Sequence, residues 1–216
     1  MEDILVVLSK TLILAEGMAV AAGFYRYATI KNTPWKWFLY YLLFIFCVEV
    51  SALTEVFNEH VNRKLFFGFI IIPIEFVFFY WLYAWQSFHN KKLFWIFSLV
   101  YLLSFLPHRY LENHGSMVYS FNYVVGAFLL ALLLVLEYLK QIRSDSILQF
   151  KENKMFYINL GVSLLYLGTL PFFSFYAIIL KNDIIYMNYY LFFYIANHLM
   201  YLLFSMSFLW GKPNTY

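Results

Sequence analysis

Apolar residues fill most of the chain in seven runs, and short polar stretches separate them. The runs cover Ile4–Arg26, Trp37–Asn58, Leu65–Phe88, Leu93–Leu106, Met117–Leu139, Met155–Leu180 and Met187–Trp210. A helix needs roughly 20 mostly apolar residues to cross the hydrocarbon core of a bilayer. The pattern therefore predicts an all-α, polytopic membrane protein, with a single domain over residues 1–216 folded as a bundle of seven transmembrane helices.

The fourth run is too short to cross without help from its flanks. Long side chains beside a short apolar run can extend to the interface, so Lys92, His108 and Arg109 are expected to complete this crossing. Composition agrees with a membrane location, because 63% of the residues are hydrophobic and only 12% are charged. A soluble domain of that composition would lack polar surface. A cleavable signal peptide is not expected, since the chain opens with acidic residues.

The distribution of Lys and Arg predicts the orientation. Of the 15 basic residues, ten fall on one side of the predicted spans and four on the other, while Lys10 lies inside the first span. Basic residues accumulate in cytoplasmic loops. We therefore expect the N-terminus outside and the C-terminus in the cytoplasm. The formal charge of +3 follows from this excess, so no direct nucleic-acid binding is expected.

Ionisable residues inside the spans are the candidate functional residues, because each costs a few kcal/mol at bilayer depth. They are Lys10, Glu16, Glu49, Glu55, Glu75 and His198. Helical spacing places Glu55 on a polar stripe with Ser51 and Asn58, and Glu49 about half a turn away from it. We expect Glu49 to lie outside a shared pocket, which would consist of Lys10, Glu55, Glu75, Asn197 and His198, with Lys10 paired to a carboxylate.

Three interpretations of this predicted pocket stay open. In the first, the polar groups join helices through hydrogen bonds and an ion pair. In the second, they line a cavity for a small polar ligand or ion, and in the third they catalyse a reaction. Pro73 and Pro171 could break their helices where a cavity is lined. No enzyme, cofactor or phosphate-binding motif occurs, so no catalytic residue and no cofactor is expected.

Two loops carry further candidate chemistry. His108, Glu112 and His114 are spaced as metal ligands could be, but a fourth ligand is lacking, and we expect a solvated loop and no metal site. The longest predicted cytoplasmic loop, residues 141–154, carries Arg143 and Lys151 and ends at Lys154. These three residues form the candidate surface for a cytoplasmic protein partner.

Short motifs give a resemblance over nearly the whole chain. The segment Ile72–Phe76, the Asn159–Gly161 stretch and the Asn197–His198 pair resemble a mostly uncharacterised group of seven-helix membrane proteins of Bacteroidota. This resemblance implies a multi-pass protein of the bacterial inner (cytoplasmic) membrane. In size, composition and multi-span character the chain is also similar to the membrane accessory proteins of type VI-B CRISPR systems. That similarity implies antiviral defence through modulation of an RNA-guided nuclease from the membrane.

Two classes of function follow. The first is a non-enzymatic regulatory or sensory accessory of the inner membrane, acting through residues 141–154. The alternative is a small-solute or ion transporter or channel, with a polar path through the helix bundle. Microbial rhodopsins are excluded, because they attach retinal to a lysine of the seventh helix and Met187–Trp210 contains none.

Overall fold

The computed structural model describes residues 2–54, 61–107, 120–144 and 150–212, and helices and turns account for nearly all of them. The first half of the chain forms α1 (Glu2–Tyr25), α2 (Tyr27–Ile30), α3 (Trp35–Ala52), α5 (Arg63–Phe66), η1 (Phe67–Ile71), α6 (Ile72–Tyr80), η2 (Trp81–Ser87) and α7 (Lys91–Leu103). The second half forms α9 (Ser120–Arg143), α10 (Lys154–Val162), η4 (Ser163–Leu167), α11 (Gly168–Ser174), α12 (Tyr176–Ile179) and α13 (Asp183–Trp210). The η segments are π-helical turns.

Six stretches of helix in the described residues are long and apolar enough to cross a membrane. This confirms the all-helical class, and the six helices are compatible with a multi-pass membrane protein. The count of seven is not reached by length, because the predicted fourth span is α7, a helix of 13 residues. At 1.5 Å of rise per residue it extends only about 20 Å, against about 30 Å of hydrocarbon.

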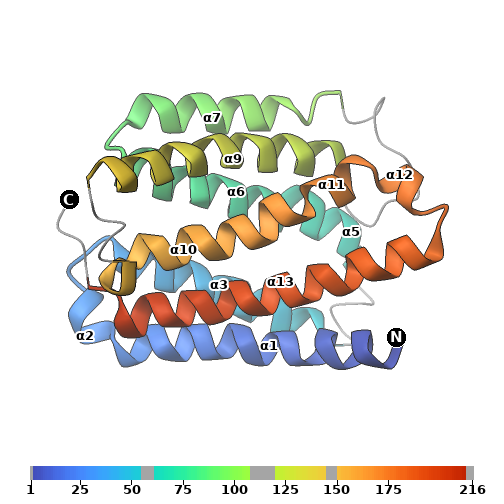
Figure 1. The fold of residues 1–216 in the computed structure, drawn as a ribbon, viewed down its shortest axis with the longest axis horizontal. Helices are drawn as coiled ribbons and strands as arrows, with labels where there is room; N and C mark the ends of the chain where they lie inside the picture. Colours follow the sequence, from blue (N-terminus) through green and yellow to red (C-terminus); the bar gives the residue numbers. More distant parts are fainter. Residues whose placement is uncertain (1, 55–60, 108–119, 145–149, 213–216) are drawn as a thin grey trace.

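The long helices lie lengthwise in one bundle (Figure 1). The last helix, α13, packs along α1 and also along α10, so the two ends of the sequence meet on one side of the bundle. The short helix α7 packs against η2 and α9 on the other side. The start of α1 and the end of α13 lie at opposite ends of the long axis.

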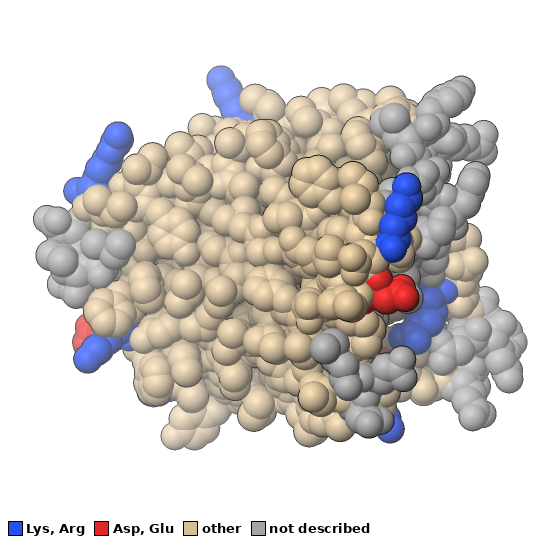
Figure 2. Space-filling model, turned by 45° about the vertical axis from the view of Figure 1, so that its right-hand side comes forward, with Lys and Arg blue, Asp and Glu red and all other residues tan. Residues whose placement is uncertain are grey.

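Charged side chains gather toward the two ends of the bundle. In the face shown in Figure 2, most of the surface between the ends carries no Lys, Arg, Asp or Glu. Large apolar side chains are exposed along the helices of the bundle, such as Leu14, Leu99 and Leu132. An exposed apolar band of this extent would be costly in water and is favourable against lipid.

Asparagine side chains mark the beginning of several helices. Asn90, Asn153 and Asn182 each stand before a helix in an extended conformation and accept a hydrogen bond from a backbone N–H of its first turn. Such N-caps satisfy a donor that the helix itself cannot pair. These residues fix where α7, α10 and α13 begin at the ends of the bundle.

Breaks in the helices coincide with prolines and π-helical turns. Pro73 stands in the first turn of α6, directly after the π-helical segment η1, and Pro171 lies inside α11. Proline has no N–H to donate and displaces the preceding turn, so an adjoining helix must readjust its hydrogen bonds. Both predicted breaks therefore correspond to local irregularities, and the one at Pro73 places Glu75 in the first turn of α6.

Aromatic rings fill the centre of the bundle. Phe76 is fully buried and contacts Tyr101, Tyr123 and Tyr166 with ring centroids 5.2 to 5.5 Å apart. A Cβ added at Gly126 of α9 would lie 2.7 Å from the Phe76 ring, so only glycine allows this approach. Small residues let membrane helices pack closely in this way. This packing holds α6 and α9 in place beside the polar groups described next.

Candidate functional site

Three glutamates from three helices interact inside the bundle. Glu16 of α1 is 3% exposed, while Glu49 of α3 and Glu75 of α6 are half-buried. The negative charge of Glu16 is acted on by both Glu49 and Glu75, and Glu49 also acts on Glu75. Like charges brought together in a poorly solvated site repel each other. The bundle therefore brings three carboxyl groups under one another's electrostatic influence.

Buried tyrosines surround these carboxylates. The Tyr166 hydroxyl donates to Glu75 Oε2 at 3.2 Å. The Tyr201 side chain is hydrogen-bonded to Glu16, and the Tyr41 side chain is hydrogen-bonded to Tyr166. Glu16, Glu49, Glu75, Tyr41, Tyr166 and Tyr201 are called the carboxylate cluster below.

Local helix geometry positions two members of the cluster. Tyr166 lies in η4, a π-helical segment between α10 and α11. A π-helical turn inserts an extra residue and rotates the side chains that follow, and such turns are frequent at functional sites. Glu75 follows η1 and Pro73, as described above. The two irregular helices thus meet through the hydrogen bond between Tyr166 and Glu75.

The negative charge of the cluster is not balanced by a basic side chain within it. Glu16 Oε2 has no hydrogen-bond partner among the described residues. Arg63, at the start of α5, acts on Glu49 from beyond ion-pair distance. The single ion pair in the described part of the chain, Lys212 with Glu152, is exposed at the end of the bundle. The site therefore has acceptor oxygens available for a proton or a cation.

The predicted Lys10 pair is not formed. The Lys10 side chain is exposed, and no ion pair joins it to Glu75. An ammonium group on a long aliphatic stem can reach the interface, and exposure on α1 avoids the desolvation that a buried pair would require. The other proposed partner, Glu55, lies outside the described residues.

The two polar residues of α13 lie where predicted in the sequence, but they bond mainly to helix backbones. Asn197 is buried and its Nδ2 donates to the Phe193 carbonyl at 3.0 Å. His198 Nδ1 donates to the Tyr194 carbonyl at 2.8 Å, and its Nε2 lies 3.1 Å from Thr11 Oγ1. His198 therefore ties α13 to α1, and no hydrogen bond links either residue to Glu75.

Sequence spacing predicted that one pocket does not easily hold both Glu49 and Glu55, and the predicted pocket included Glu55. Glu55 lies outside the described residues, and Glu49 acts on both Glu16 and Glu75. Spacing within one helix gives relative angles, and only the neighbouring helices decide which angle faces inward. Tyr166 and Tyr201 could have been found from the polar stripes of their helices. Tyr41 gave no such signal, because aromatic residues surround it in the sequence.

A fourth buried glutamate belongs to a separate set of contacts. Glu137 of α9 is fully buried and accepts hydrogen bonds from Ser87 Oγ and, at 3.2 Å, from Gln141 Nε2. Lys140 Nζ donates to the Ser87 carbonyl at 2.7 Å and acts electrostatically on Glu137. These four residues are called the Glu137 network. Both of the Glu137 oxygens have donors, so the network joins η2 to α9.

Of the three residues of the predicted partner surface, two are exposed and one is buried. Arg143 and Lys151 are exposed at the same end of the bundle. Lys154 is 1% exposed, and its Nζ donates to the Ser207 carbonyl at 3.1 Å. The prediction was wrong for Lys154, because its ammonium group satisfies a carbonyl in the last turn of α13, where a cation is favoured by the helix dipole.

In the described residues, no three His, Cys, Asp or Glu side chains lie close enough together to hold a metal ion. The predicted loop trio of His108, Glu112 and His114 lies outside those residues. Within the bundle, the carboxylate cluster offers oxygen atoms to a proton or a hydrated cation. Comparisons of the chain with protein-family models, curated proteins and solved structures find no match.

Proposed function

We propose that the chain is an ion or small-solute transporter or channel, in which the carboxylate cluster binds a proton or a hydrated cation. The observation that carries this proposal is the state of Glu16, which is 3% exposed, has an unpartnered Oε2 atom and faces two more carboxylates. A buried carboxylate is costly unless its charge is neutralised. A species from outside the chain supplies that neutralisation here.

Oxygen chemistry supports a proton or a hydrated cation as this species. Carboxylate and tyrosine oxygens replace part of the water shell that a permeating ion loses in the membrane. The acidic groups in the described residues are not close enough to chelate a bare metal ion. Two kinds of ligand fit acidic groups that influence one another without being close enough for chelation. One is a proton that moves among Glu16, Glu49 and Glu75, and the other is an ion that keeps some of its water.

Seven crossings, with the N-terminus outside, form part of the proposal. The start of α1 and the end of α13 lie at opposite ends of the bundle, which supports an odd number of passes (Figure 1). The additional pass beyond the six long helices is then α7. Cysteines introduced at Asn62 and Leu106, after Cys47→Ser, should react with an impermeant reagent from outside, and a cysteine at His89 should not. Equal labelling at Leu106 and His89 would remove the seventh crossing.

The transport proposal is tested in proteoliposomes that contain a pH-sensitive dye. We expect an imposed potential to drive proton or Na⁺ movement through the native protein and Glu16→Gln to reduce it at least tenfold. The matched control is Glu152→Gln, which removes an exposed charge outside the cluster. If the native protein moves neither ion, and no carboxyl band in its infrared spectrum responds to pH or Na⁺, the proposal fails.

The regulatory or sensory accessory is the competing proposal. The exposure of Arg143 and Lys151 at the predicted cytoplasmic end favours it, since a soluble partner could reach both. An RNA-guided nuclease of a type VI-B system is the partner that the sequence resemblance implies. The phenotype of the native operon separates the classes, with membrane levels matched. An accessory would lose function in Arg143→Glu/Lys151→Glu, whereas a transporter would lose it in Glu75→Gln.

A further inference from the structure

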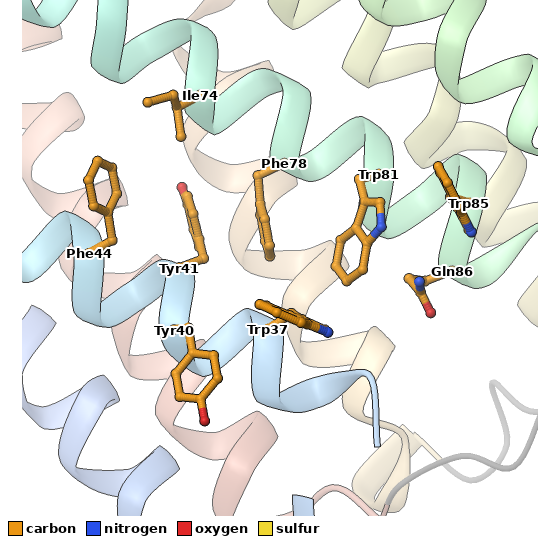
Figure 3. Close-up of a pocket in the computed structure, with 9 residues that line it drawn as sticks. All are labelled: Trp37, Tyr40, Tyr41, Phe44, Ile74, Phe78, Trp81, Trp85 and Gln86. Atoms are coloured by element: carbon orange, nitrogen blue, oxygen red, sulfur yellow. The ribbon is translucent and has the colours of Figure 1, made fainter. Parts of the chain in front are cut away.

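An aromatic groove runs along the outside of the bundle between α3 and the α6–η2 stretch (Figure 3). Its volume is about 560 Å³, within the range of small-molecule sites. From α3 come Trp37, Tyr40, Tyr41 and Phe44, of which Tyr41 and Trp37 lie toward Phe78 and Trp81 of the second wall (Figure 3). No acidic side chain in the described part of the chain lines it.

Aromatic rings of the two walls contact each other at the base of the groove. Tyr41 stacks on Phe78 with ring centroids 4.0 Å apart and planes only 3° from parallel. This stacked pair forms the floor of the groove, and Trp37 and Trp81 stand beside it (Figure 3). Trp37 is 53% exposed and Phe44 41% exposed, so the groove opens outward. On a membrane-spanning bundle, such an opening faces the acyl chains of the bilayer.

Two lysines stand at one end of the groove. Lys91 Nζ lies 5.0 Å from the centre of the Trp85 ring, and Lys36 Nζ lies 5.6 Å from that of Trp37. Both tryptophans line the groove. Neither lysine forms an ion pair with a described carboxylate. Each ammonium group is held by a ring on one side and keeps donors for an anion on the other.

We propose that this groove is a binding site for one anionic phospholipid. One acyl chain lies against Tyr41, Phe44 and Phe78, and the phosphate lies between Lys36 and Lys91. The Gln86 side chain, which lines the same end, donates a further hydrogen bond to the head group. The positive charge at one end of the groove matches the anionic head group of such a lipid, and the apolar remainder of the groove matches its acyl chain. A lipid with an uncharged head group would match only the apolar part.

The location of the lysines supports a lipid of the cytoplasmic leaflet. Lys36 and Lys91 lie at the end of the bundle that holds the larger share of basic residues in the sequence. Basic pockets between helices on that side bind anionic head groups, and the cytoplasmic leaflet supplies them. Tyr41 also belongs to the carboxylate cluster, so the lipid would lie against a wall of that site.

Quenching of tryptophan fluorescence by brominated lipid tests the proposal on the full-length protein in phosphatidylcholine vesicles. A small fraction of brominated phosphatidylglycerol should quench more strongly than the same fraction of brominated phosphatidylcholine. This excess should disappear in Trp37→Phe/Trp81→Phe/Trp85→Phe, which removes the reporters of the groove. Equal quenching by the two lipids in the native protein would overturn the preference for an anionic head group.

Two lysine variants locate the head group. Lys36→Gln/Lys91→Gln should weaken the apparent affinity for brominated phosphatidylglycerol, by about fivefold for each lysine removed. Lys92→Gln/Lys181→Gln is the matched control, because it removes two exposed lysines outside the groove and should leave the affinity unchanged. If both double variants weaken binding equally, the attraction is general and the site is overturned. Circular dichroism of each variant shows that the helices are retained.

Discussion

Two regions of this bundle bury glutamate in opposite ways. In the Glu137 network, the carboxylate accepts hydrogen bonds from Ser87 and Gln141, and Lys140 lies beside it. In the carboxylate cluster, Glu16 faces two further glutamates, and its Oε2 has no donor in the described residues. The same residue type therefore serves as a fully bonded joint in one place and as an open acceptor in the other.

This difference separates structural from functional burial. A carboxylate whose oxygens all have donors stabilises the fold, because removing it leaves those donors unpaired. A buried carboxylate oxygen without a donor is a liability for the fold, and a bound proton or cation would account for it. Removing a glutamate should therefore have opposite effects in the two regions.

The largest effect is expected at Glu137. Glu137→Leu should lower the free energy of unfolding by about 3 kcal/mol, because Ser87 and Gln141 lose their shared acceptor and Lys140 loses a nearby negative charge. Reversible unfolding in mixed micelles measures the loss. Leu136→Ala, at a partly exposed neighbouring position, controls for truncation on α9 and should cost less. A Glu137→Leu protein as stable as the native one would show that the network is not a joint.

A smaller effect of opposite sign is expected at Glu16. Glu16→Gln keeps the shape of the side chain and removes a buried charge whose Oε2 has no donor in the described residues, so the free energy of unfolding should rise by up to about 1 kcal/mol. The same change should abolish the response of protein stability to Na⁺ or to pH. A loss of stability as large as that in Glu137→Leu would place Glu16 among the structural contacts.

The smallest effect distinguishes two tyrosine hydrogen bonds that each have one partner in η4. Tyr166→Phe removes the donor to Glu75, and Tyr138→Phe removes the hydrogen bond of 3.1 Å to Ser163. Each should lower the free energy of unfolding by about 0.6 kcal/mol, as single hydrogen bonds in membranes do. Only Tyr166→Phe should change proton or Na⁺ movement. Equal transport in both variants would show that Tyr166 has no role in proton or Na⁺ movement.

Much of the fold could be predicted from the sequence. The apolar runs gave the helices, and the structure differs mainly at their ends, where Asn90 and Asn182 begin α7 and α13 earlier than the hydrophobic pattern does. The site was predicted less well. Glu75 was predicted to lie in a polar pocket with Lys10; it is half-buried, its donor is Tyr166, and the Lys10 side chain is exposed.

The sequence by itself determined the all-helical class and a membrane location, because both depend on local runs of apolar side chains. Only the tertiary structure decided that Glu49 joins Glu16 and Glu75, that Lys154 is buried beneath α13, and that Tyr41 connects the cluster to the aromatic groove. Hydrophobicity and helical period fix what each segment is. They leave free how each helix is rotated and which helix it meets, and those two quantities decide whether a buried charge finds a donor.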